Sequence, residues 1–371
     1  MKKNKIKILN IVGARPNFMK IAPLFKEYRK NKTIVPVLVH TNQHSDEKMS
    51  GVFLKSLNIP RPNYNLNINK KSPISTISSI MSGLEPILKR ERPDLVVVVG
   101  DVNSTLAGAL AANKSGIKVA HVEAGLRSED LNMPEEINRI LVDHISEILF
   151  VTEKSGLKNL QKENVTKSKI FFVGNTMIDN LINTLPKIDR SKILNKIGIE
   201  GDKYIVLTMH RPSNVDSRKK LLTLIEMKKR IIKDTSMKII FPIHPRTLNN
   251  VKIHGLLGEL KKIKDLIVVD PLDYLDFIKL IKKSSLILTD SGGIQEEAAY
   301  LKIPTITLRE STERPSTVEC GANVLHQIGN VDDLIEKIKI ALTVKRNSIK
   351  DIPLNDGKAA QKIVKTILNA F

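Results

Sequence analysis

The chain has 371 residues, enough for two domains, and its 41% hydrophobic and 27% charged residues are typical of a globular protein and exclude a disordered one. A single cysteine, Cys320, excludes an internal disulfide and a cysteine-based metal cage, and it suits a reducing compartment. The N-terminal apolar run is interrupted by Lys7 and makes a poor signal peptide, and no uncharged run reaches membrane length. We therefore expect a cytoplasmic protein without membrane insertion.

The net charge is +21, from 60 Lys and Arg against 39 Asp and Glu. A basic protein invites a nucleic-acid interpretation. The basic residues, however, are dispersed over predicted helices, as in Lys228-Lys229-Arg230, and aromatic residues make up only 4% with no Trp, so base-stacking surfaces are scarce. We expect a solvated lysine-rich surface, no nucleic-acid partner, and a positive field that favours an anionic substrate.

The N-terminal half alternates short apolar runs with segments of helical periodicity, such as 74–89 and 135–145. The predicted strands are Ile6–Val12, Ile34–Val39, Leu95–Val99, Ile117–Val122, Ile148–Val151 and Ile170–Val173. Because these runs are rich in β-branched residues and nearly free of charge, the alternation predicts a buried parallel sheet with helices on both faces.

The same alternation restarts after a break that contains Pro186, Gly198 and Gly201. Its predicted strands are Tyr204–Met209, Lys238–Ile243, Leu266–Val269, Leu286–Thr289 and Thr305–Leu308. We therefore predict an α/β protein with two Rossmann-like doubly wound domains, residues 1–178 and 179–355. Residues 356–371 form an amphipathic helix that we expect to pack back on the N-terminal domain.

Polar side chains follow seven of the predicted strands. They are Arg15, Asp101, Glu123, His210 with Arg211, His244, Asp290 with Ser291-Gly292-Gly293, and Arg309 with Glu310. Doubly wound sheets bind ligands at the carboxyl ends of their strands. We therefore expect one shared site in the cleft between the two domains.

The Ser291-Gly292-Gly293 turn precedes a predicted helix, with Glu297 about one turn inside it. Glycines admit a ligand close to the backbone, and a helix N-terminus offers free N–H groups to phosphate. The alternative is that Ser291 only caps the helix. With His244 and Arg211 also at strand ends, the pattern favours a diphosphate site whose ribose is held by Glu297.

Asp101, Glu123 and Glu135 are candidate acid/base residues. Glu123 is expected in a strand-end loop, whereas Glu135 and Glu136 open a helix and could serve only its dipole, an alternative that is strong for Glu136. His210 is a candidate titrating group beside the fixed cation Arg211.

Arg15 and Lys20 could bind an anion, with a capping arginine and a surface lysine as the alternatives. His40 and His44 have a four-residue spacing but are expected in a loop, so no metal site is predicted.

Taken together, nine motifs in order resemble the non-hydrolysing UDP-N-acetylglucosamine 2-epimerases from residue 13 to about residue 321. They are Gly13-x-Arg15-Pro16 with Lys20, Thr41-x-Gln43-His44, Gly100-Asp101, His121-Val122-Glu123-Ala124-Gly125-Leu126-Arg127, Pro134-Glu135-Glu136-x-Asn138-Arg139, Thr208-x-His210-Arg211, His244-Pro245, Asp290-Ser291-Gly292-Gly293-x-Gln295-Glu296-Glu297 and Arg309-x-x-Thr312-Glu313-Arg314-Pro315. Asn17 stands where many members carry Glu, and Asn42 where many carry Gly.

The resemblance implies a GT-B architecture, a homodimer, a role in polysaccharide precursor biosynthesis, and interconversion of UDP-N-acetylglucosamine and UDP-N-acetylmannosamine. In the family, UDP is eliminated to leave a 2-acetamidoglucal and is then added back, with no cofactor or metal. Carried over by motif, the catalytic positions are Asp101, Glu123, Glu135 and His210. The substrate- and UDP-binding positions are Arg15, Lys20, Arg211, His244, Ser291, Gly292, Gly293, Glu297 and Arg314, and Gln43 with Arg211 would belong to a regulatory site.

Three other functions share much of this pattern. A hydrolysing 2-epimerase would release UDP and free N-acetylmannosamine, and a GT-B glycosyltransferase would add an acceptor site. A nucleotide-sugar-binding regulatory protein would not need the intact acid/base residues.

Overall fold

The computed structural model describes residues 5–41, 57–68 and 72–371. The chain divides into two compact units. Unit 1 comprises Met1–Ile182 with Pro353–Phe371, and unit 2 comprises Asn183–Ile352. The boundaries expected from the sequence were 178/179 and 355/356.

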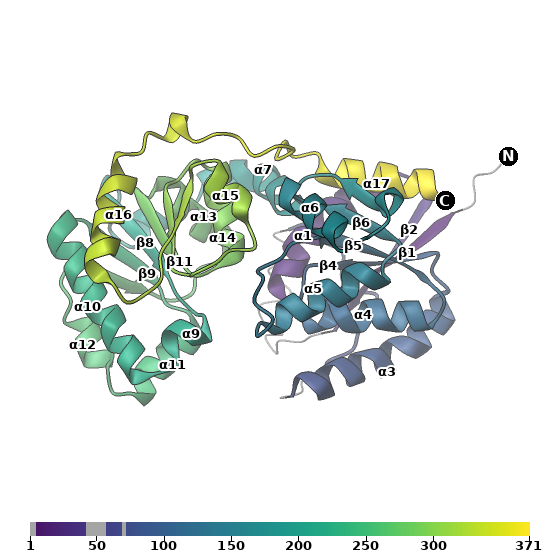
Figure 1. Cartoon of the computed structure of the whole chain (residues 1–371), viewed down its shortest axis with the longest axis horizontal. Coiled ribbons are helices and arrows are strands. Elements are labelled where there is room, and N and C mark those ends of the chain that lie inside the picture. Colours follow the sequence, from purple (N-terminus) through teal and green to yellow (C-terminus); the bar gives the residue numbers. More distant parts are fainter. Residues whose placement is uncertain (1–4, 42–56, 69–71) are drawn as a thin grey trace. The chain divides into compact units, whose positions relative to one another are not determined.

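Unit 1 is built on a seven-stranded parallel sheet with the order β3-β2-β1-β4-β5-β6-β7 (Figure 1). The strands are β1 (Ile6–Val12), β2 (Ile34–His40), β3 (Tyr64–Asn65), β4 (Leu95–Val99), β5 (Lys118–Ala124), β6 (Ile148–Val151) and β7 (Ile170–Phe172). The central strand β4 reads Leu-Val-Val-Val-Val and is buried throughout, as expected of a strand covered on both faces.

Helices cover both faces of this sheet. They are α1 (Arg15–Tyr28), α3 (Pro73–Glu91), α4 (Asn103–Lys114), α5 (Pro134–Ile145), α6 (Lys154–Lys162), the 3₁₀ turn η1 (Lys167–Lys169), α7 (Thr176–Asp189) and α17 (Ala359–Ala370). Helices α3, α4 and α5 pack side by side in one layer (Figure 1). On the other face, α1 packs against α17. The right-handed β–α–β crossovers place α1 and α4 on opposite faces, because their connections run in opposite directions from the centre of the sheet.

The C-terminal helix completes unit 1. Its inward residues Ile363, Val364 and Ile367 are buried. The carboxylate of Asp179, on α7, accepts hydrogen bonds from the backbone N–H groups of Ala359 (3.2 Å) and Ala360 (2.7 Å). This carboxylate therefore caps α17 in the place of a local N-cap side chain.

Unit 2 contains a six-stranded parallel sheet with the order β10-β9-β8-β11-β12-β13. The strands are β8 (Tyr204–Thr208), β9 (Lys238–Pro242), β10 (Leu266–Val269), β11 (Leu286–Thr289), β12 (Thr305–Thr307) and β13 (Asn323–Leu325). The helices are α8 (Ile193–Lys196), α9 (Pro212–Val215), α10 (Arg218–Thr235), α11 (Pro245–Ile253), α12 (Leu257–Lys261), α13 (Tyr274–Lys283), α14 (Gly292–Tyr300), α15 (Pro315–Glu319) and α16 (Val331–Thr343), with the 3₁₀ turn η2 (Arg346–Ser348).

The predicted α/β class with two doubly wound sheets is confirmed. In each sheet the strand order reverses at a central pair, β1 and β4 in unit 1 and β8 and β11 in unit 2. Such switch points are where open α/β sheets bind ligands. Within the part of the chain that is described, no helix is long and apolar enough to cross a membrane.

Candidate functional site

In unit 1, the ends of β1 and β4 lie close together at the switch point. A Cβ atom on Gly13 would lie 2.0 Å from Oγ of Ser104, so only glycine allows this approach of the chain to α4. The side chain of Asn17 accepts hydrogen bonds from the N–H groups of Gly13 (3.1 Å) and Ala14 (2.9 Å), which fixes the turn. Arg15 opens α1 and is exposed.

The turn that carries Asp101 has three consecutive carbonyl groups held by side chains of other elements. The bonds run to Val99 O from Asn17 (3.0 Å) and Thr105 (2.9 Å), to Gly100 O from His121 (2.8 Å), and to Asp101 O from Asn138 (2.8 Å). Arg139 also pairs with the Asp101 carboxylate at 3.0 Å. The position of Asp101 is therefore set by the protein itself, the preorganisation that an acid/base group requires.

Glu123 corrects one expectation. It lies inside β5 and not in a loop beyond it, at a β-bulge where the pairing with β6 skips from Val122 to Ala124. Its φ of 79° is in the left-handed region, where residues other than glycine are strained. The bulge turns a residue of the strand out of the regular ladder, and sequence periodicity cannot predict that extra residue.

The Glu123 carboxylate is only 4% exposed and pairs with Lys20 of α1 at 2.7 Å. Lys20 is itself buried, so the alternative of a surface lysine is wrong. The ion pair places a cation beside a carboxylate in a setting of low exposure, where the charged form of each group stabilises the other.

The two glutamates that open α5 have different surroundings. Glu136 is buried, accepts hydrogen bonds from the N–H groups of Ser128 (2.9 Å) and Glu129 (2.9 Å), and pairs with Arg139. Glu135 is half-buried, and its side chain has no hydrogen bond or ion pair with any residue that the structure describes. Glu136 therefore holds the loop before α5 in place, and the Glu135 carboxylate remains available to a ligand.

In unit 2, Asp290 follows β11 and holds the residues that follow β8 through hydrogen bonds. Asp290 is fully buried and accepts hydrogen bonds from the N–H groups of His210 (3.0 Å) and Arg211 (2.9 Å), while its carboxylate lies 3.1 Å from Nδ1 of His210. Burial alone would raise the pKa of Asp290, but the hydrogen bonds and charge of His210 outweigh it and hold that pKa below its usual range. This carboxylate orients the His210 ring, a role that the sequence did not assign.

The centres of the His244 and His210 rings lie 5.2 Å apart. Burial, and secondly the charge of His210, lower the pKa of His244. Its Nδ1 accepts a hydrogen bond from the N–H of Arg246 at 3.2 Å, so His244 caps α11 and leaves its other nitrogen for a ligand.

The N-terminus of α14 follows β11 directly. Ser291 occupies the N-cap position of α14, as the capping alternative expected, but its side chain makes no capping hydrogen bond. A Cβ on Gly292 would lie 2.5 Å from Oε1 of Glu313. Glu297, one turn later, is buried and accepts a hydrogen bond from the hydroxyl of Tyr274 at 2.9 Å. Gly293 lies in the first turn of α14, where its N–H faces the open end of the helix.

Arg314 is buried and pairs with Glu296 at 2.7 Å. Gln43 and His44 lie outside the described residues. Among the residues that are described, no group of three or more His, Cys, Asp and Glu side chains is placed to hold a metal ion.

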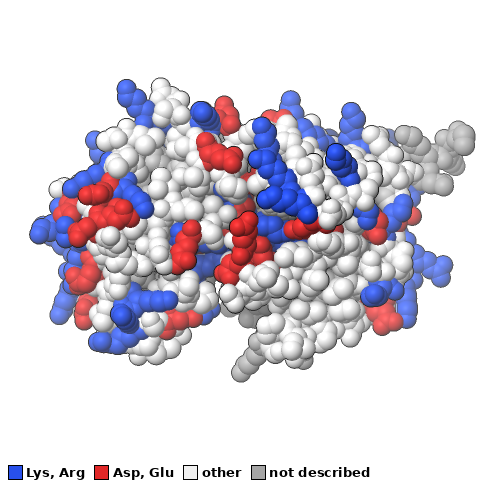
Figure 2. Space-filling view, in the orientation of Figure 1, with Lys and Arg blue, Asp and Glu red and all other residues white. Residues whose placement is uncertain are grey.

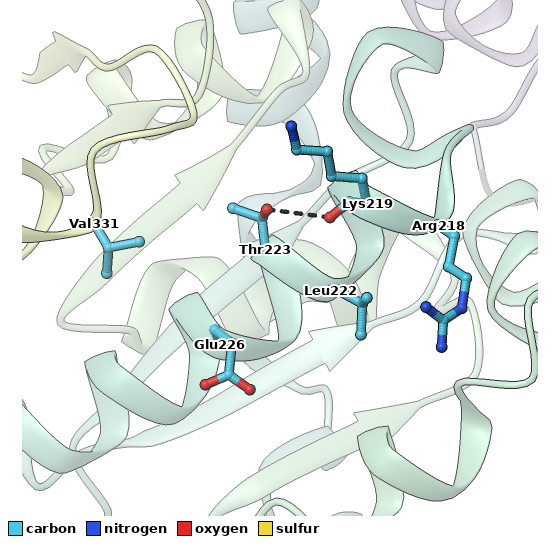
Figure 3. Close-up of a pocket in the computed structure, with 6 residues that line it drawn as sticks. All are labelled: Arg218, Lys219, Leu222, Thr223, Glu226 and Val331. Carbon is cyan, nitrogen blue, oxygen red and sulfur yellow. Dashed lines mark hydrogen bonds between the residues drawn. The ribbon is translucent and has the colours of Figure 1, made fainter.

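A separate hollow of about 480 Å³ lies on unit 2 beside α10 (Figure 3). It is lined by Arg218, Lys219, Leu222, Thr223, Glu226 and Val331, and the Thr223 hydroxyl is bonded within the helix to Lys219 O at 3.1 Å. It contains none of the predicted site residues, and we assign it no role.

Comparison with known proteins settles the family. The sequence model described as UDP-N-acetylglucosamine 2-epimerase matches residues 26–368. The chain belongs to the UDP-N-acetylglucosamine 2-epimerase family. It is 44% identical over 367 residues to the UDP-N-acetylglucosamine 2-epimerase of Methanocaldococcus jannaschii, covering 98% of this chain and 99% of that protein. It is also 38% identical over 349 residues to the UDP-2,3-diacetamido-2,3-dideoxy-D-glucuronate 2-epimerase of Pseudomonas aeruginosa, covering 93% and 94%.

Solved structures agree with this assignment to the 2-epimerase family. The crystal structure of the Methanocaldococcus jannaschii epimerase in complex with UDP-GlcNAc and UDP superposes with a TM-score of 0.91 at 43% identity, covering 98% of this chain and 100% of that one. The epimerase from Neisseria meningitidis bound to UDP-GlcNAc superposes with a TM-score of 0.86 at 32% identity, covering 98% and 100%.

Proposed function

We propose that this 2-epimerase family member interconverts UDP-N-acetylglucosamine and UDP-N-acetylmannosamine without net hydrolysis. The observation that carries the proposal is the group of buried or fixed carboxylates in unit 1, Asp101 and Glu123, with Glu135 near them in the chain. Inversion at C2 requires removal of a weakly acidic proton from one face and delivery of a proton to the other. More than one positioned acid/base group is therefore needed.

Unit 2 is proposed to bind the UDP portion. The first turn of α14 offers backbone N–H groups from Gly292 and Gly293 to the diphosphate, and Ser291 adds a hydroxyl. Glu297 would accept hydrogen bonds from the ribose. Arg211, His210 and His244 would stabilise the negative charge that develops on the diphosphate as the C1–O bond breaks.

Unit 1 is proposed to act on the sugar. Glu123 and Glu135 exchange the C2 proton, Asp101 assists, and Lys20 positions the Glu123 carboxylate through their ion pair. Arg15 would add a cation for the diphosphate and Arg314 would order the substrate side of unit 2. Elimination of UDP leaves a 2-acetamidoglucal, and re-addition of UDP with the opposite C2 configuration completes the reaction.

The test is NMR of UDP-N-acetylglucosamine incubated with the enzyme in D₂O. We expect deuterium at C2 and an intact UDP-N-acetylmannosamine product. Release of free N-acetylmannosamine would replace this proposal with the hydrolysing reaction, and no change would favour a transferase or a binding protein. UDP-2,3-diacetamido-2,3-dideoxy-D-glucuronate is assayed in parallel, because one relative carries that substrate in its name.

We also propose a homodimer that forms through the outer face of α5. This helix is inverted relative to most surface helices. Apart from Val142, its buried side carries the polar residues Glu136, Asn138, Arg139 and Asp143, whereas Ile137 and Leu141 are 40% and 45% exposed. Two copies with a net charge of +21 repel each other, so an apolar face without lysine or arginine is the favourable place for them to meet.

A further inference from the structure

The buried side of α5 carries one carboxylate, Asp143, that none of the steps above uses. Asp143 is 1% exposed and His121, on β5, is fully buried. Oδ1 of Asp143 lies 2.7 Å from Nδ1 of His121. Oδ2 accepts a hydrogen bond from the N–H of Gly125 at 3.0 Å and pairs with Arg127 at 2.8 Å. One carboxylate thus contacts the chain on both sides of Glu123.

The contacts on either side of Glu123 matter because its backbone is strained. Glu123 and Gly125 have φ angles of 79° and 80°, so two of three successive residues are in the left-handed region. For a glutamate this conformation persists only where neighbouring contacts impose it. The bonds from Asp143 to His121 before the bulge and to Gly125 after it supply such contacts.

The other nitrogen of His121 reaches the second acid/base group. Nε2 lies 2.8 Å from the carbonyl oxygen of Gly100, and that residue precedes Asp101. A carbonyl oxygen can only accept, so Nε2 donates to Gly100, and Nδ1 faces the carboxylate of Asp143.

We infer that the His121–Asp143 pair is a positioning unit that sets Glu123 and Asp101 in one geometry. This inference rests on the proposed function, since it takes those two carboxylates as the acid/base groups. The pair itself is buried, with His121 0% and Asp143 1% exposed. Its effect on the reaction passes through the two backbone turns that it joins.

The experiment compares Asp143→Asn and His121→Gln with Glu147→Gln. Glu147 is a matched control, because its carboxylate accepts a hydrogen bond from the N–H of Val119 (2.7 Å) at the opposite end of the same strand β5. We expect kcat to fall about 100-fold in Asp143→Asn and His121→Gln, the size associated with displacement of a reacting group by about 1 Å. The Kd of UDP, measured by calorimetry on the full-length variants, should stay within about twofold of the wild-type value, because we assign UDP to unit 2.

A purely structural role predicts another pattern, in which all three variants lower Tm and none lowers kcat per folded enzyme. That pattern, or an equal loss of kcat in Glu147→Gln, would overturn the inference. A crystal structure of Asp143→Asn gives a test that does not depend on activity. Departure of Glu123 from positive φ supports the inference, and an unchanged Glu123 and Lys20 pair refutes it. Absence of epimerisation in the wild-type enzyme would instead refute the proposed function.

Discussion

The surroundings of Glu123 and Asp290 are built by residues that lie far from them in the chain. Glu123 was expected because it follows a strand, and the same pattern could not reveal its positive φ or its buried partner Lys20. Those features arise from a bulge and from a contact 103 residues away in the chain. Asp290 and His121 were visible in the motifs, but their hydrogen-bond partners come from other strands and helices.

We predict that Glu123→Gln and Glu135→Gln each lower kcat ~10²–10⁴-fold, because amide side chains cannot exchange the C2 proton. The Kd of UDP should change little, since we assign UDP to unit 2. Steady-state kinetics and calorimetry on both variants test this. Glu129→Gln, at an exposed position of the loop between β5 and α5, serves as the control, and we expect it to have a normal kcat. If Glu135 serves only the dipole of α5, its variant would lose ~0.3–1 kcal/mol of stability and keep its turnover.

Lys228 carries a prediction about stability. It is buried on the inner side of α10, with Nζ 4.6 Å from the centre of the Phe241 ring, and burial lowers its pKa to about 7. In the unfolded chain the amine titrates near 10.5. Between these values the unfolded state binds more protons, so the contribution of Lys228 to stability becomes less unfavourable as pH rises from about 7 to 10.5 and is flat below about 7.

We therefore expect Lys228→Met to raise the free energy of unfolding by ~1–3 kcal/mol at neutral pH, with a gain that shrinks towards pH 10. Urea unfolding at a series of pH values measures it. Lys229→Met, at the adjacent exposed position, should leave stability nearly unchanged. A destabilised Lys228→Met would mean that the contact with Phe241 outweighs the cost of burial.

Among the elements, periodicity predicted most of the strands within one or two residues, and the helical segments 74–89 and 135–145 match α3 and α5 equally closely. β1, β4, β6, β10 and β11 have the predicted bounds, because apolar runs bounded by polar or loop residues leave little choice. The two-residue β3 and the three-residue β13 were not predicted, since so short a run shows no periodicity. The inverted α5 could not be recognised either, because a helix with polar residues on its buried side shows the same periodicity as one with the opposite orientation.

The start of α14 supplies the next prediction. Glu297→Ala should weaken UDP binding about 10–100-fold, because it removes a charged acceptor from the proposed ribose site. Calorimetry with UDP alone isolates the effect from chemistry. Tyr274→Phe, which removes the hydroxyl bonded to Glu297, should weaken binding less, and Glu259→Gln on the exposed side of α12 should not alter it. Normal affinity in Glu297→Ala would remove the ribose assignment.

At the scale of the whole molecule, the charge is spread and not concentrated. Figure 2 shows lysine and arginine side chains intermixed with acidic ones over the visible face. The dispersed pattern agrees with the expectation drawn from composition.

The proposed dimer gives the last prediction. Leu141→Lys should shift the protein towards monomer, because it places a like charge in the proposed apolar interface on α5. Analytical ultracentrifugation over a range of concentrations measures the shift. Ile253→Lys is the control, since Ile253 is an exposed isoleucine on α11 of unit 2. Unchanged association of Leu141→Lys would exclude α5 as the interface.

The hydrogen bonds between Asp179 and α17 have a consequence for the order in which the two units fold during synthesis. Unit 2 is one uninterrupted stretch, residues 183–352, so all of its strands are synthesised before residues 353–371 of unit 1. Unit 1 begins first, yet its α1 gains its covering helix only after residues 359–370 have emerged. Domains usually mature in the order of synthesis. Here the last element of unit 1 is synthesised after the whole of unit 2, so α1 can pack on β2 and β4 early but gains its contact with α17 late.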